Sequence, residues 1–166
     1  MHTMVNGYGV AQICREGHIA NPAMHANPSR NKAHCTTCGA ETISTCQSCT
    51  KPIRGAYCSV RYGAVQVNPL VKAPAFCEHC GAPFPWTESR LDAANDLADQ
   101  LGLDIPERTL LEKSIEELVR DTPRAPAEAV RFKGIVTKAQ PWALGAFKEI
   151  LYGVVGETAK RMIWPA

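Results

Sequence analysis

Residues 35–49 read CTTCGAETISTCQSC and contain two C-x-x-C pairs that are separated by only seven residues. A C-x-x-C turn directs both sulfurs at one ion, at roughly 2.3 Å, and its backbone N–H groups can hydrogen-bond the thiolates. A glycine directly after the second cysteine suits the left-handed backbone that closes such a turn. Gly39 occupies this place after Cys38. The stretch therefore predicts a small fold that is built around metal-binding turns.

Further ligand pairs lie on both sides of this stretch. Cys14-x-x-x-His18 precedes it, and Cys77-Glu78-His79-Cys80-Gly81 begins after 27 intervening residues. Four pairs of ligands complete two tetrahedral sites, so we expect two Zn²⁺ ions per chain. We assign His18 as the fourth ligand of its site, because three cysteines need a fourth partner and its offset from Cys14 is suitable.

The pairs can be combined in two ways. In the sequential scheme, site 1 is Cys14, His18, Cys35 and Cys38, and site 2 is Cys46, Cys49, Cys77 and Cys80. The alternative joins the two central pairs at one ion and leaves the first and last pairs for the other. We prefer the sequential scheme because seven residues make a short hairpin between two facing turns.

Length and composition limit the remaining possibilities. A chain of 166 residues can form one sizeable core, or a metal-held unit followed by a helical one. It contains no apolar run of transmembrane length and no basic-then-apolar signal peptide. Six of the eight cysteines fall in C-x-x-C pairs, which favours metal binding in a reducing cytoplasm over disulfides. Cys58 is left over, and we interpret it as a half-buried residue of a ribbon arm.

The formal charge is distributed unevenly. Residues 1–86 carry +4, residues 87–121 carry −6 and residues 122–166 carry +4, within a net charge of +2. A zinc ion with four thiolates has a net charge of −2, and one with three thiolates and a neutral histidine has −1, so metal binding lowers the first segment to about +1. This favours nucleic-acid binding only weakly.

The segments around the ligand pairs indicate short strands and loops. Residues 8–13 (YGVAQI) predict a strand that leads into Cys14, and two Asn-Pro pairs make 19–32 a turn-rich loop. Residues 41–45 form a β-prone link, and 54–67 predict hairpin arms. We therefore expect a double zinc ribbon over residues 8–86.

After Trp86 the hydrophobic pattern changes to a helical spacing, and we expect about four helices over residues 87–164. Thr87 is expected to cap the first helix, with Glu88 in its first turn. Pro106, Pro126 and Pro141 are expected to open the others. The apolar positions expected to face inward in the second and third helices are Leu110, Leu111, Ile115, Leu118, Val119, Ala129, Val130, Phe132 and Val136. The expected fold class is α+β, with metal-stabilised tandem ribbons before an α-helical region.

The last helix is expected to run from Pro141 to about Trp164. Its apolar stripe suits the core of a small bundle, although a protein partner or a second copy could use the same face in a weak homodimer. Its five charged residues exclude a buried transmembrane span. The stripe consists of Leu144, Phe147, Ile150, Leu151, Val154, Val155 and Met162.

The order of these motifs resembles an uncharacterised bacterial family that is catalogued as a domain of unknown function containing a double zinc ribbon. The likeness rests on Ala11-Gln12-Ile13-Cys14 with Gly17-His18, on the three C-x-x-C pairs, on Pro52-Ile53-Arg54-Gly55, on Pro85-Trp86-Thr87 and on Asp121-Thr122-Pro123-Arg124. It covers nearly the whole chain. The resemblance implies zinc at Cys14, His18 and the three cysteine pairs, and it implies no activity.

These patterns favour a non-enzymatic, zinc-binding adaptor for protein partners. Both sites have four ligands, and we find no phosphate-binding loop, nucleophile elbow or paired acid and base. The alternative is a ribbon protein that binds nucleic acid through Arg54, Arg61 and Lys72 with Tyr57 and Tyr62. The sequence identifies neither the partner nor the oligomeric state.

Overall fold

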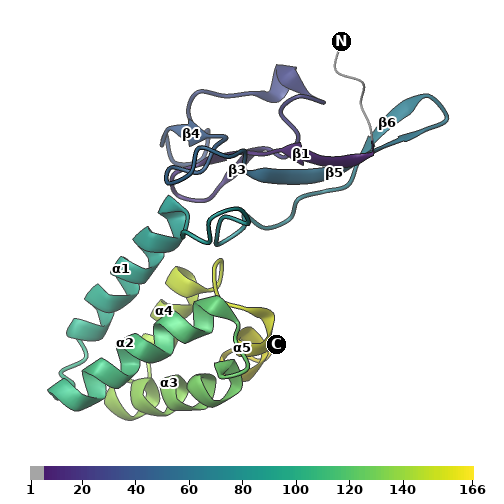
Figure 1. Cartoon of the computed structure of the whole chain (residues 1–166). Coiled ribbons are helices and arrows are strands. Elements are labelled where there is room, and N and C mark those ends of the chain that lie inside the picture. Colours follow the sequence, from purple (N-terminus) through teal and green to yellow (C-terminus); the bar gives the residue numbers. More distant parts are fainter. Residues whose placement is uncertain (1–5) are drawn as a thin grey trace. The chain divides into compact units, whose positions relative to one another are not determined.

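The computed structural model describes residues 6–166, and the chain divides into two compact units, Met1–Thr87 and Glu88–Ala166. The first unit contains two small antiparallel sheets and the second is helical, which confirms the expected α+β class (Figure 1). The division falls within helix α1 (Pro85–Asp99), just after Thr87. We describe each unit by itself.

One sheet of the first unit has the order β1-β5-β6, with strands β1 (Gly7–Val10), β5 (Arg54–Arg61) and β6 (Ala64–Val67). The hairpin expected over residues 54–67 is confirmed, and its two strands pair from Cys58 opposite Val67 to Arg61 opposite Ala64. Tyr62 and Gly63 form the turn, with φ of 52° and 78°. Two consecutive residues with positive φ match the right-handed twist of the strands that they join.

The other sheet has the order β3-β2-β4, with strands β2 (Gln12–Cys14), β3 (Ile19–Asn21) and β4 (Thr42–Ile43). The single strand expected over residues 8–13 is therefore wrong, because β1 and β2 belong to different sheets. The chain changes sheet at Ala11, which is fully buried and donates its N–H to the Ile53 carbonyl at 2.9 Å. A short 3₁₀ helix, η1 (Pro28–Arg30), lies within the loop that follows β3.

Where the chain passes from one sheet to the other, three backbone segments approach closely at Gly55. A Cβ at this position would lie 2.3 Å from the Pro22 carbonyl oxygen and 2.8 Å from the Ala11 nitrogen. Neither neighbour is a flexible side chain, so only glycine fits. The buried apolar residues of the first unit include Ile13, Ile43, Ile53, Phe84 and Trp86.

The second unit contains α2 (Ile105–Arg120), α3 (Ala125–Ala139), α4 (Ala143–Leu151) and α5 (Glu157–Ile163), together with most of α1. Helix α3 packs against α2, α4 and α5. Asp104 caps α2 by accepting a hydrogen bond from the N–H of Glu107 at 2.8 Å. The largest fully buried side chains of this unit are Phe132, Phe147, Leu111, Ile115, Leu118, Leu151, Ile163, Val136 and Val155.

Three expectations for the helical region are wrong. Thr87 does not cap a helix, since α1 begins two residues earlier and the buried Thr87 hydroxyl donates to the Ala75 carbonyl at 2.7 Å. The helix expected from Pro141 to Trp164 is two helices. Three residues expected to face inward are instead 38–64% exposed, namely Leu110, Val130 and Met162.

The break between α4 and α5 has a packing cause at Gly156. Its N–H donates to the Leu118 carbonyl near the end of α2, at 3.1 Å, and a Cβ there would lie 2.2 Å from the Asp121 Cγ. The extended backbone of Gly156, with ψ of 157°, lets the chain pass this point and begin α5. Tertiary contacts with α2 therefore override the helical periodicity of the sequence.

Candidate metal centres

The first cluster brings together Cys14, His18, Cys35 and Cys38, whose ligand atoms all lie within 4.8 Å of one another. Cys14 ends β2 and His18 precedes β3, so the short hairpin between these strands presents both side chains. The Cys14 Sγ lies 3.5 Å from the His18 Nδ1 and 3.8 Å from the Cys38 Sγ. The histidine thus directs Nδ1, rather than Nε2, toward the sulfurs.

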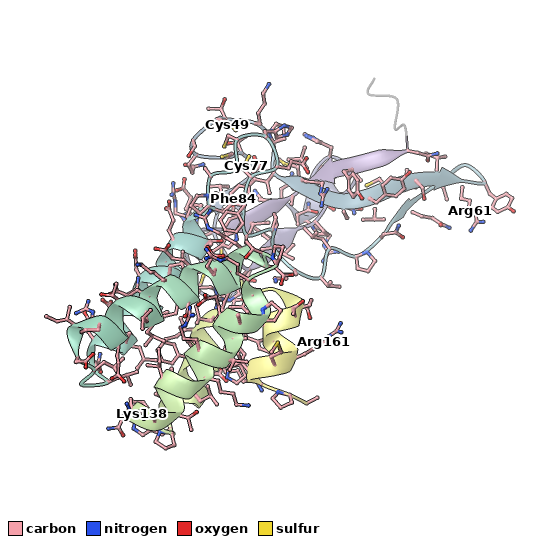
Figure 2. The ribbon with its side chains drawn as sticks, turned by 60° about the horizontal axis from the view of Figure 1, so that its bottom comes forward. Cys49, Arg61, Cys77, Phe84, Lys138 and Arg161 are labelled. Atoms are coloured by element: carbon pink, nitrogen blue, oxygen red, sulfur yellow. The ribbon has the colours of Figure 1, made fainter. Side chains whose placement is uncertain are left out.

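The second cluster contains Cys46, Cys49, Cys77 and Cys80, again within 4.8 Å. Two sulfur–sulfur contacts connect the two turns. The Cys46 Sγ lies 3.8 Å from the Cys80 Sγ, and the Cys49 Sγ lies 3.7 Å from the Cys77 Sγ. Figure 2 shows Cys49 and Cys77 together in this region of the first unit. The two clusters contain the same residues as the two sites of the sequential scheme. The alternative combination of pairs is not found among residues 6–166.

The separations fit a tetrahedral ion. Zinc–sulfur bonds of roughly 2.3 Å at the tetrahedral angle place two sulfurs about 3.8 Å apart, and a sulfur and a nitrogen about 3.6 Å apart. The observed distances of 3.7–3.8 Å and 3.5 Å agree with both values. The clusters have the S₃N and S₄ donor sets that structural zinc sites use. Both groups of side chains can therefore hold a metal ion.

All three C-x-x-C turns have the same backbone. In each, the N–H of the residue after the second cysteine donates to the carbonyl of the first, and this residue has positive φ. Gly39 and Gly81 fill two of these positions, with φ of 76° and 74°. Thr50 fills the third, with φ of 61°, although no glycine marks this position in the sequence. An isolated antiparallel bridge flanks each turn.

These turns also hold the sulfurs electrostatically. The Thr37 N–H donates to the Cys35 Sγ at 3.3 Å, and the His18 N–H donates to the Cys14 Sγ at 3.2 Å. Hydrogen bonds from the backbone of Cys38 and Thr37 lower the pKa of Cys35 to about 6. At Cys46 burial opposes ionisation, but the backbone of Cys49 and Ser48 outweighs it and lowers the pKa to about 7.

One other cysteine of each cluster has a raised pKa. Burial raises the pKa of the Cys14 thiol to about 11, against hydrogen bonds from the His18 and Glu16 backbone. The pKa of Cys80 is about 12; the Ala82 backbone lowers it, but burial and the Cys49, Cys46 and Cys77 sulfurs raise it more. Without a cation, therefore, the three sulfurs of the first cluster and the four of the second cannot all ionise easily at neutral pH. A divalent ion supplies the positive charge that lets them do so.

Cys58 lies in neither cluster. It is buried on β5 beside Ala23 and Ala56, and its thiol donates to the Ala56 carbonyl at 3.7 Å. This placement is that of a small core residue.

The residues suggested for nucleic-acid binding do not form one free basic face. The Arg54 guanidinium pairs with Glu78 at 3.2 Å and lies 4.7 Å from the centre of the Tyr8 ring. Tyr57 packs edge-on against Tyr8. Arg61 lies near the tip of the β5–β6 hairpin (Figure 2), and Lys72 lies beyond β6. One of the three cations is thus already neutralised by a carboxylate.

Comparison with known proteins gives one family match. No helix among the described residues has the length and apolar character needed to cross a membrane. No curated protein and no solved structure matches the chain. One family model, described as an uncharacterized protein conserved in bacteria (DUF2321), matches residues 7–163 and so covers both units. The chain therefore belongs to this bacterial family.

Proposed function

We propose that the protein is a non-enzymatic adaptor in which two zinc ions stabilise the first unit and the β5–β6 hairpin binds a protein partner. The observation that carries the proposal is Tyr62, a fully exposed aromatic side chain at the tip of this hairpin. The metal centres supply the rigidity, and the hairpin supplies the contact.

The metal centres favour a structural role. A catalytic zinc keeps a coordination position for water or substrate, whereas each cluster here offers four protein ligands. Two of the four ligands of the first cluster and two of the second are buried, so the sulfurs are partly screened from solvent. This arrangement suits zinc that is coupled to folding, which supports a non-enzymatic role.

The hairpin has the chemistry of a protein-binding element. An aromatic residue with positive φ is unfavourable, so the turn accepts strain that glycine or asparagine would avoid. Val60 and Val65 are opposite each other in the register next to this turn, and they are 44% and 43% exposed. Tyrosine and arginine are the residue types that dominate binding energy at interfaces, and Arg61 adjoins Tyr62.

The charge of the hairpin indicates the type of partner. Residues 54–67 contain Arg54 and Arg61 and no acidic residue. We therefore propose a partner whose binding cleft is apolar at its base and acidic at its rim, which would receive Tyr62 and Arg61 together.

The test begins with purification of the tagged, zinc-loaded chain from a bacterium that has a member of this protein family. The proteins retained with it are identified by mass spectrometry. The affinity of each purified candidate is then measured for the wild type and for Tyr62→Ser with Val60→Ser. We expect the hairpin variant to bind about tenfold more weakly or worse, as at other interface hot spots. Val71→Ser is the matched control, because Val71 is 88% exposed but lies outside the hairpin.

Two results would argue against this proposal. A partner bound equally well by the hairpin variant would dock elsewhere on the chain. Tight, salt-sensitive binding to DNA or RNA that is lost in Arg54→Ala with Arg61→Ala would instead support the nucleic-acid alternative, since phosphate contacts weaken steeply as salt rises.

A further inference from the structure

We propose that a hollow beside the first metal cluster binds a phosphate group. The hollow has a volume of about 370 Å³. It lies between the β3 end of the β2–β3 hairpin, the η1 segment and the Cys35 turn. This site is independent of the β5–β6 hairpin and of the proposed adaptor role. Its lining residues are His18, Ile19, Ala20, Ser29, Arg30, Lys32, Cys35, Thr36 and Thr37.

The polar groups of the hollow are mostly donors without partners. Within residues 6–166, Arg30 and Lys32 form no ion pair, and the hydroxyls of Ser29, Thr36 and Thr37 form no side-chain hydrogen bond. No carboxylate lines the hollow. A guanidinium, an ammonium and several hydroxyls, with no competing acid, are the groups that hold an oxyanion in other proteins.

His18 adds a further donor because of the way it joins the cluster. Its Nδ1 is the nitrogen next to the Cys14 sulfur, at 3.5 Å, and its ring is exposed at the hollow. When Nδ1 serves as the ligand atom, the neutral ring carries its proton on Nε2, on the far side from the metal. A phosphate oxygen in the hollow can accept a hydrogen bond from this Nε2–H.

The loop that carries the two cations is fixed by a buried amide. The Asn21 side chain is fully buried and donates to the Asn27 carbonyl at 2.8 Å and to the Asn31 side chain at 2.6 Å. The Asn21 Oδ1 accepts from the Ala23 N–H, and the Lys32 N–H donates to the Gln12 side chain at 2.8 Å. Arg30 and Lys32 are therefore carried by a backbone that is anchored on both sides, which lowers the entropy lost on binding.

The charge and shape of the hollow indicate which anion fits. A zinc ion with three thiolates and one histidine has a net charge of −1, and Arg30 and Lys32 together contribute +2, so the hollow remains cationic after metal binding. Histidine is the only ring among the lining residues, so no tyrosine, tryptophan or phenylalanine is present to stack on a base. We therefore assign the site to a phosphate monoester or to inorganic phosphate, recognised by its oxygens.

The experiment titrates the zinc-loaded full chain with inorganic phosphate, and separately with O-phosphoserine, at constant ionic strength and neutral pH. Amide and imidazole NMR signals are followed, together with the zinc content of each sample. We expect saturable one-to-one binding that shifts the signals of the η1 segment, the Cys35 turn and the His18 ring. Tighter binding of phosphoserine would assign the site to an esterified phosphate, and tighter binding of inorganic phosphate would assign it to the free ion.

The matched variants separate a defined site from diffuse charge. Arg30→Ala with Lys32→Ala removes both cations of the hollow and should weaken phosphate binding by about tenfold or more. Arg15→Ala with Lys51→Ala removes the same charge from the same unit but outside the hollow, and should bind as the wild type does. Absence of saturation in the wild type, equal weakening in both variants, or undiminished binding by the first variant would each overturn the assignment.

Discussion

Removal of one buried hydroxyl, in Ser114→Ala, is expected to weaken the helical unit measurably. Ser114 on α2 is fully buried and donates to the Glu128 carboxylate of α3 at 2.7 Å. The same carboxylate accepts from the Arg131 guanidinium at 2.6 and 2.7 Å. Because Arg131 is 45% exposed, solvent screens that ion pair, and the buried hydroxyl is the better shielded partner.

The size of the effect follows from these contacts. A hydrogen bond to a charged group contributes about 1.5–3 kcal/mol, and Glu128 keeps Arg131 when the hydroxyl is removed. Alanine regains about 0.5 kcal/mol through its higher helix propensity. We therefore expect a net loss of about 1–2.5 kcal/mol in the free energy of unfolding. In a unit of this size each kcal/mol lowers the melting temperature by about 4–8 °C, which circular dichroism of the zinc-loaded chain can follow.

The pH dependence of this loss has a defined sign. The hydrogen bond from Ser114 and the pairing with Arg131 lower the pKa of Glu128 below its ordinary value of 4.5. A carboxylate whose pKa is lowered by folding stabilises the protein above its unfolded-state pKa, and this contribution disappears as the pH falls through the folded-state value. The difference between wild type and Ser114→Ala should therefore be full at neutral pH and shrink below pH 4.5. Equal melting temperatures at neutral pH, or a difference that grows in acid, would refute this reasoning.

Thr109→Ala is the control for Ser114→Ala, because the exposed Thr109 hydroxyl donates only to the Ile105 carbonyl of its own helix.

Three further outcomes test the first unit. Elemental analysis should find two zinc ions per chain, each coupled to folding by about 10 kcal/mol, and one ion or none would contradict the central proposal. In cobalt-substituted protein, Cys38→Ser with Cys46→Ser should disturb both the mixed thiolate–imidazole spectrum and the all-thiolate spectrum; survival of the mixed spectrum would show that the pairs are combined differently. Gly55→Ala should prevent folding or lower stability by more than about 3 kcal/mol, because its Cβ would lie 2.3 Å from the Pro22 carbonyl oxygen. Gly9→Ala, whose Cβ meets only ordinary contacts at 3.5 Å, is its control, and similar melting of the two variants would be inconsistent with the crowding.

Local signals made much of the first unit predictable. Each C-x-x-C turn is specified by a few adjacent residues, so its position follows from the sequence, as does the β5–β6 hairpin. Thr50 escaped notice because positive φ is attributed to glycine by default, although the turn at Cys46 imposes it on a threonine. The change of sheet at Ala11 also escaped, because it depends on the carbonyl of Ile53, which is distant in the sequence.

The helical unit shows the same limit. The helical spacing of apolar residues correctly located α2 and α3, whose buried faces repeat at the helical period. The pattern continues through residues 152–156, where the chain leaves the helix to meet Leu118 and Asp121 of another segment. Periodicity describes one face of one helix, so it cannot register a break imposed by a neighbour. The placement of Thr87 was missed for the same reason, since its hydroxyl partner is the Ala75 carbonyl.

The order in which the two clusters appear along the chain matters during synthesis. Every ligand of the first cluster precedes Cys46, and the strands β2, β3 and β4 that support it end at Ile43. A nascent chain emerging from the ribosome thus exposes a complete first site, with its own sheet, before any ligand of the second has appeared. Strand β1, by contrast, must wait for β5. The first cluster can therefore bind a metal ion while translation continues, and its sheet is then available as a template when the rest of the unit is made.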